Sequence, residues 1–96
     1  MKDFEKSSRE LFDKIVDFIE SCHLVDDIEL TESVIQFSVQ DVDFVINKHR
    51  CSKEVWLSSK KTGPHHFKPS NNGWLNDKGL EILNLLGSLV KDLNGS

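Results

Sequence analysis

The chain has 96 residues, 38% of them hydrophobic, and a formal net charge of −4. This length permits one domain, residues 1–96, with a modest core, so we expect marginal stability and a melting midpoint no higher than roughly 45–65 °C. No apolar run approaches the roughly 18 residues of a membrane-spanning helix. Cys22 and Cys51 form no CxxC pair, which argues against a disulfide scaffold or a structural zinc site.

Charge is distributed unevenly along the chain. Residues 1–46 include twelve acidic and four basic side chains, whereas residues 47–96 include eight basic and four acidic ones. The net charges of these segments, −8 and +4, predict a molecule with oppositely charged regions. Because the larger field is negative, the pattern disfavours a nucleic-acid binder.

Residues 3–22 are predicted to form a long amphipathic helix. Apolar side chains recur there at spacings of three and four residues, as they do on one face of a helix. They are Phe4, Leu11, Phe12, Ile15, Phe18, Ile19 and Cys22.

The same helix has an acidic sector nearly opposite its apolar face. At about 100° per residue its acids fall within a sector of roughly 100°, and like charges such as Asp13 and Asp17 repel at this spacing. Carboxylate oxygens suit hard cations, including ferric iron and partly hydrated ferrous iron, although a solvated helix face is the alternative. Further acids extend the sector if the first strand lies at the sheet edge beside the helix. We call the predicted set the acidic ridge: Glu10, Asp13, Asp17, Glu20, Asp26, Asp27 and Glu29.

The middle of the chain predicts an antiparallel meander of short strands. Apolar and polar residues alternate in residues 27–30, 35–39 and 42–46, and residues 55–57 are short and β-prone.

Turn-forming residues at 63–64 and 69–73 precede a final amphipathic helix over residues 80–93. Helices at both ends of a run of strands predict an α+β fold. We expect a two-layer sandwich in which the N- and C-terminal helices pack on one face of an antiparallel sheet.

Trp56 lies between two apolar residues of its strand, Val55 and Leu57. If those two point into the core, alternation directs the indole to the other face, where Trp is typical of interface hot spots. A register shift of one residue would bury it instead, and the sequence leaves both orientations open. Asn47 and Lys48 lie nearby if their strand pairs with this one; alternatively, they are a turn asparagine and a solvated lysine.

No preformed catalytic centre is predicted. Ser58 and His65 are not accompanied by the Gly-x-Ser-x-Gly elbow of a hydrolase. Glu20 and His23 form a single Glu-x-x-His pair, whereas a ferritin-like di-iron site needs two. We interpret His65 and His66 as surface groups that add positive charge when protonated.

Several short motifs cover nearly the whole chain. They are Phe44-Val45-Ile46-Asn47-Lys48, Val55-Trp56-Leu57-Ser58-Ser59, Gly63-Pro64-His65-His66-Phe67, Trp74, and residues 79–86. This set resembles the signature of the frataxin family, called CyaY in bacteria. The predicted order of an acidic helix, an antiparallel sheet and a closing helix is also similar to that of frataxin.

The resemblance implies an iron-binding accessory protein that regulates iron–sulfur cluster assembly. It implies that the acidic ridge holds ferrous and ferric iron weakly and openly, and docks on a basic surface of the cysteine desulfurase. The exposed sheet face is implied to contact the scaffold protein through Asn47, Lys48, Trp56 and His66. Ferroxidase activity is attributed to eukaryotic members of the family, but we assign no catalytic residue.

A metal-independent alternative stays open. The same carboxylates can form salt bridges to arginines, which would make the chain a protein adaptor that bridges two partners through oppositely charged faces. We expect a monomer that can form iron-driven oligomers if it binds iron, and no nucleic-acid or membrane partner. The N-terminal residues resemble neither a signal peptide nor a transit peptide, and we expect a bacterial cytoplasm, the mitochondrial matrix or a mitochondrion-derived organelle.

Overall fold

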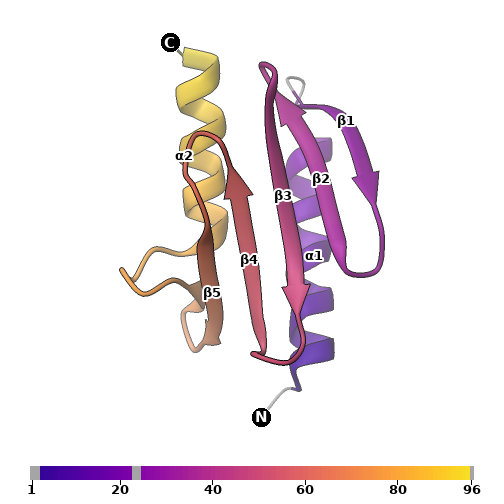
Figure 1. Cartoon of the computed structure of the whole chain (residues 1–96), viewed down its shortest axis with the longest axis vertical. Coiled ribbons are helices and arrows are strands. Elements are labelled where there is room, and N and C mark those ends of the chain that lie inside the picture. Colours follow the sequence, from indigo (N-terminus) through magenta and orange to yellow (C-terminus); the bar gives the residue numbers. More distant parts are fainter. Residues whose placement is uncertain (1–2, 23–24, 96) are drawn as a thin grey trace.

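The structure is a computed structural model that describes residues 3–22 and 25–95. Along the chain, one helix precedes six strands and a second helix follows them (Figure 1). The elements are α1 (Phe4–Glu20), β1 (Val25–Leu30), β2 (Val34–Val39), β3 (Val42–His49), β4 (Glu54–Ser59), β5 (His65–Ser70), β6 (Gly73–Leu75) and α2 (Ile82–Gly95).

The strands form one antiparallel sheet in sequential order, β1 to β6. Both helices lie on the same side of it, α1 behind the β1–β3 half and α2 behind the β4–β5 half (Figure 1). This confirms the predicted α+β two-layer sandwich. The opposite side, which we call the outer face, is not covered by any element of the described residues.

Helix α1 begins after a capping residue, Asp3. The Asp3 side chain accepts a hydrogen bond from the Lys6 backbone N–H at 2.8 Å and satisfies one of the free donors of the first turn. The apolar stripe then packs on the sheet, with Leu11, Phe12 and Ile15 buried. No helix in the described part of the chain is long and apolar enough to cross a membrane.

The core lies between the two helices and the sheet, because each strand turns alternate side chains inward. The stacked rings of Phe37 and Phe44, with centroids 5.1 Å apart, lie in the middle of the β2–β3 pair. The buried apolar strand residues are Ile35, Phe37, Val39, Phe44, Ile46, Val55, Leu57, Phe67 and Trp74.

The predicted turn at residues 69–73 is shorter in the structure. Pro69 and Ser70 complete β5, and Gly73 already begins β6, a strand that the sequence analysis did not predict. The Ser70 hydroxyl closes this hairpin by donating to the Gly73 carbonyl at 2.9 Å and accepting from the Asn72 N–H at 3.1 Å. Gly73 has a φ of 103°, a backbone conformation that glycine adopts without steric cost.

Helix α2 begins at Ile82, two residues later than predicted, because side chains organise the preceding loop. The Asn76 side chain accepts hydrogen bonds from the N–H groups of Lys78 and Leu80, at 3.0 and 2.8 Å. The Glu81 carboxylate then caps the helix by accepting from Leu83 and Asn84 at 3.1 and 3.0 Å.

Candidate functional site

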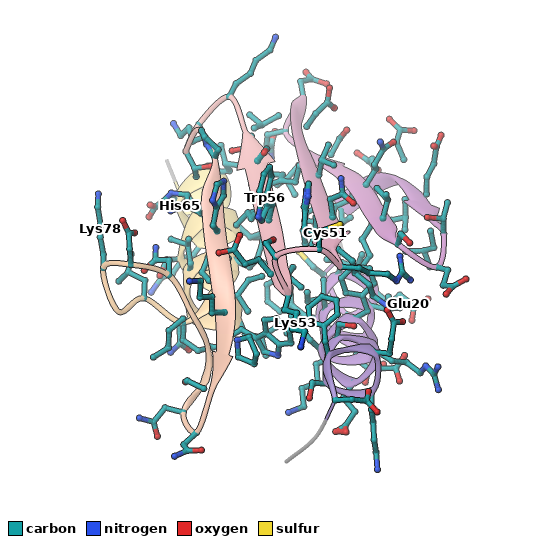
Figure 2. The ribbon with its side chains drawn as sticks, turned by 60° about the horizontal axis from the view of Figure 1, so that its bottom comes forward. Glu20, Cys51, Lys53, Trp56, His65 and Lys78 are labelled. Atoms are coloured by element: carbon teal, nitrogen blue, oxygen red, sulfur yellow. The ribbon has the colours of Figure 1, made fainter. Side chains whose placement is uncertain are left out.

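The strand register places a row of three polar and aromatic residues across the outer face. Asn47 on β3 pairs with Trp56 on β4, and Trp56 pairs with His66 on β5. Paired residues of antiparallel strands have side chains on the same face. Trp56 therefore points away from the core, which is one of the two orientations that the sequence left open (Figure 2). It is half-buried.

The indole of Trp56 is held between two imidazole rings. The His49 ring lies on one side, with centroids 3.5 Å apart and an interplanar angle of 21°, and the His66 ring lies at 4.0 Å and 7°. Both faces of the indole are thus covered by side chains of the neighbouring strands. We call His49, Trp56 and His66 the ring stack.

Glu54 fixes the orientation of the Trp56 indole in the ring stack through a hydrogen bond. Its carboxylate accepts the indole N–H of Trp56 at 2.9 Å and lies 3.9 Å from the ammonium group of Lys68. The Glu54 side chain is only 13% exposed. The hydrogen bond from Trp56 is the main reason that the pKa of Glu54 lies below its ordinary value, with smaller contributions from Ser52, Lys68 and His66.

Lys48 does not share this surface, which corrects its grouping with Asn47 and Trp56. It pairs with Val55, so strand alternation turns it toward the helices, where it is 8% exposed. Its ammonium group lies 4.7 Å from the centre of the Phe12 ring of α1. Lys48 lines a hollow of about 230 Å³ between α1 and the end of β1.

The α1 members of the acidic ridge lie in one sector of the helix surface but differ in exposure. Asp13, Asp17 and Glu20 are exposed on α1. Glu10 is half-buried and lines a different hollow, with Trp74 and Glu81 on the side of β6 and α2. Helix rotation does not separate them, because at about 100° per residue Glu10 lies about 20° from Asp17 and about 60° from Asp13. Glu10 is less exposed because it lies beside β6 and the start of α2. His23, the partner of Glu20 in the predicted pair, lies outside the described residues.

The acids of β1 continue the ridge around the sheet edge onto the outer face. β1 is an edge strand, as the ridge requires, and its last residues lie beside α1. However, Asp26 pairs with Ser38 and Glu29 with Gln36, so both side chains point to the outer face. Asp27 lies in a β-bulge between them with a φ of 54°.

The described residues contain no group of three or more His, Cys, Asp or Glu side chains placed to hold one metal ion. The carboxylates of the ridge are instead spread over a curved surface from α1 to β1. Such donors fit a hydrated hard cation held by one or two carboxylates, and do not fit a closed coordination sphere.

The sequence analysis missed three residues of the outer face, His49, Glu54 and Asp43. Asp43 accepts a hydrogen bond from the Ser38 hydroxyl at 2.7 Å and lines a shallow hollow with Asp27 and Glu29. Strand alternation could have identified two of them. Asp43 and His49 lie four residues before and two residues after Asn47, and an even spacing along a strand places side chains on the same face.

His65 and His66 turn to opposite sides of β5, as adjacent strand residues must. The His65 ring lies 3.2 Å from the Asn76 side-chain nitrogen, whereas His66 joins the ring stack. A hollow along β5 nevertheless brings together His65, His66, Lys68 and Lys78 with the carboxylates of Glu54 and Asp77. Figure 2 labels His65 and Lys78 at this part of the surface. Two lysines and two carboxylates line this hollow, so its charge is mixed while the histidines are neutral.

Two helices on one face of an antiparallel sheet, with acids at one edge and an aromatic outer face, define a frataxin-like α+β sandwich. The family model described as frataxin-like domain matches residues 1–95 of the chain. The chain therefore belongs to the frataxin family, as its motifs predict.

Relatives of known sequence support the same placement. The chain is similar to the iron-sulfur cluster assembly protein CyaY of Vibrio cholerae serotype O1, with 37% identity over 62 residues. That alignment covers 62% of this chain and 59% of the relative, so it spans less than two thirds of the relative's length.

Solved structures share the fold. A frataxin from Psychromonas ingrahamii superposes with a TM-score of 0.82 and 25% identity, over 93% of this chain and 86% of the other. Trimeric frataxin from the yeast Saccharomyces cerevisiae, in a ferrous complex, gives a TM-score of 0.75 and 23% identity, over 100% and 89%. At that identity the yeast structure supports the fold alone.

Proposed function

We propose that this protein is an iron-binding accessory and regulator of iron–sulfur cluster assembly. The observation that carries the proposal is the match of the frataxin-like domain over residues 1–95, together with a relative named as an iron-sulfur cluster assembly protein. In this proposal the acidic ridge binds iron and docks on the cysteine desulfurase, and the outer face docks on the scaffold protein.

The carboxylates of α1 are the first iron ligands in the proposal. Asp13, Asp17 and Glu20 are all exposed on one helix, which leaves them accessible to a hydrated cation. Because no preformed cluster exists among the described residues, iron would bind weakly and exchange readily. These are properties of a carrier or sensor of iron, and we propose no catalytic residue.

The outer face is the docking surface for the scaffold protein in the proposal. Asn47, Trp56 and His66 form a continuous row on neighbouring strands. Partly buried Trp residues held in one orientation are typical of interface hot spots. Lys48 is left out, because it is buried under the sheet.

The spread of the acids favours a second candidate, a metal-independent adaptor. Carboxylates that converge on no common point can equally pair with the arginines of a partner. In this case the acidic ridge would bind one protein, the lysines Lys68 and Lys78 of the hollow along β5 would bind another, and metal binding would be incidental.

An anaerobic titration with ferrous iron separates the two candidates. We expect the backbone amide signals of residues 10–29 to broaden first, and the triple variant Asp13→Asn, Asp17→Asn, Glu20→Gln to lose this response. A matched control, Asp41→Asn, Asp77→Asn, Asp92→Asn, removes the same charge from exposed positions outside the ridge and should respond like the wild type. Desulfurase binding that is equal with and without a chelator, and no amide response to micromolar iron, would support the adaptor.

Docking on the scaffold protein is tested by Trp56→Ala. We expect binding to weaken by at least about tenfold, as for a hot-spot residue, with an unchanged circular dichroism spectrum. Leu80→Ala is the control, because Leu80 is a large apolar residue that is 44% exposed away from the outer-face row. Equal binding by the wild type and Trp56→Ala would refute the assignment of the outer face.

A further inference from the structure

We infer that docking of the outer face is regulated by protons through His49 and His66, and that the surface it binds is rich in carboxylates. This inference rests on the proposed function, because it concerns the same docking surface. It starts from the ring stack, in which two imidazoles cover both faces of one indole.

The geometry makes the two histidines part of the contact. With centroid distances of 3.5 and 4.0 Å, neither face of the Trp56 ring is open to a partner. A docking protein therefore meets the edges of three parallel rings and not a free indole face. His66 is exposed and His49 is half-buried, so both rings reach the solvent that a partner would displace.

The chemistry makes this contact responsive to pH. Histidine is the side chain whose charge ordinarily changes between pH 5 and 8. A protonated imidazole on the face of an indole forms a favourable cation–π interaction, so the stack is compatible with both charge states. Protonation of both rings therefore adds two positive charges to the outer face without a rearrangement of Trp56.

The surrounding charges give the direction of the effect. Glu54 is a carboxylate beside both rings, because it pairs with His49 in the strand register and lines a hollow with His66. It is already engaged by the Trp56 indole N–H and Lys68. Glu32, near the β3 end that carries His49, is paired with Arg50. The other charged groups near the two histidines are Lys53 in the β3–β4 loop, His65 on β5, and Asp77 and Lys78 beside His66. Protonation thus makes a mixed surface distinctly positive, which favours a partner surface with carboxylates.

The experiment measures the affinity for the purified scaffold protein at pH 8.0, 7.0 and 6.0 and at constant ionic strength. We expect binding to tighten by about 3- to 10-fold from pH 8 to pH 6, as expected for two exposed ion pairs. The double variant His49→Gln, His66→Gln should lose this dependence. The single variant His65→Gln, which changes the adjacent histidine bound to Asn76, should retain it.

A second measurement follows the stack without any partner. The NMR signal of the Trp56 indole N–H, which is donated to Glu54, should shift between pH 8 and 6 in the wild type and not in the double variant. The same signal shows whether the double variant keeps its fold.

The outcomes distinguish the inference from the proposed function. If the double variant binds with the same pH dependence as the wild type, or if binding weakens on acidification, the inference is wrong while scaffold docking stands. If the wild type binds the scaffold at no pH, the proposed docking function fails, and the inference fails with it.

Discussion

The ammonium group of Lys48 lies 4.7 Å from the centre of the Phe12 ring, beneath the sheet and between strand β3 and helix α1. The long aliphatic stem of this lysine is buried, and the residue as a whole is 8% exposed. A lysine in this position contributes both apolar packing and a cation–π contact.

Substitution of Lys48 separates these contributions. Lys48→Met keeps the stem and should change the free energy of unfolding by less than about 1 kcal/mol. Lys48→Ala removes three buried methylene groups and should lower it by about 2 kcal/mol. Urea unfolding followed by circular dichroism measures both, and equal losses in the two variants would show that the charge dominates.

A second prediction concerns Arg50, which follows β3 and contacts both helix α1 and the β1–β2 turn. Its guanidinium pairs with Glu5 of α1 and Glu32 of the β1–β2 turn, and donates to the Ser33 hydroxyl at 2.9 Å. The pKa of Arg50 is raised, mainly by its hydrogen bond with Glu5. Arg50→Lys keeps the charge and loses the forked geometry, so amide hydrogens in the first turn of α1 should exchange faster with solvent. Exchange in α2 should not change, and added salt should narrow the difference between the two proteins.

The carboxylate of Glu54 gives a third prediction, a pH-dependent one. The pKa of Glu54 is lower in the folded protein than its ordinary value. The ionised carboxylate therefore stabilises the fold fully when the pH is above the ordinary pKa, and this stabilisation is lost as the pH falls through the lowered pKa. Glu54→Gln should therefore reduce the free energy of unfolding by about 0.5–1 kcal/mol at pH 7. The difference between the wild type and the variant should shrink below about pH 4. A difference that stays constant down to pH 3 would contradict this account of the hydrogen bond.

The fourth prediction uses the backbone of Asp27. Its φ of 54° lies in the left-handed region, which costs a residue with a Cβ atom about 1 kcal/mol and costs glycine little. In iron-free protein, Asp27→Gly should be neutral or stabilising, whereas Asp27→Ala should lower the melting temperature by a few degrees. The pair share the loss of charge, so their difference isolates the backbone. Equal melting temperatures would show that the bulge relaxes in the alanine variant.

The fold was predictable because the helices and the longer strands show a clear hydrophobic periodicity in the sequence. The alternation of Ile35, Phe37 and Val39 and the stripe of α1 were enough to assign layers and faces. The short strand β6 was missed because three residues offer no period, and the Ser70 side chain that closes its hairpin resembles ordinary turn chemistry.

The site was predictable where strand alternation was applied, and not where residues were grouped by proximity in sequence. Asn47, Trp56 and His66 do lie in one row, whereas Lys48, next to Asn47 in the chain, is turned to the other face. The acidic ridge was predicted to continue on the first strand if that strand lies at the sheet edge beside the helix, and β1 does lie at the edge. Its continuation on β1 depends on the register and bulge of that strand, which composition does not reveal.

The bulge at Asp27 also affects how copies of this protein meet. β1 exposes one free edge of the sheet together with two large apolar side chains, Ile28 at 38% and Leu30 at 50% exposure. A free apolar edge invites another strand to add, but here an interrupted ladder and a row of like charges oppose it. Under the proposed function, iron bound at the same carboxylates cancels that repulsion. We therefore expect iron-driven oligomers to begin at β1, where the acids that hold the metal also keep neighbouring molecules apart.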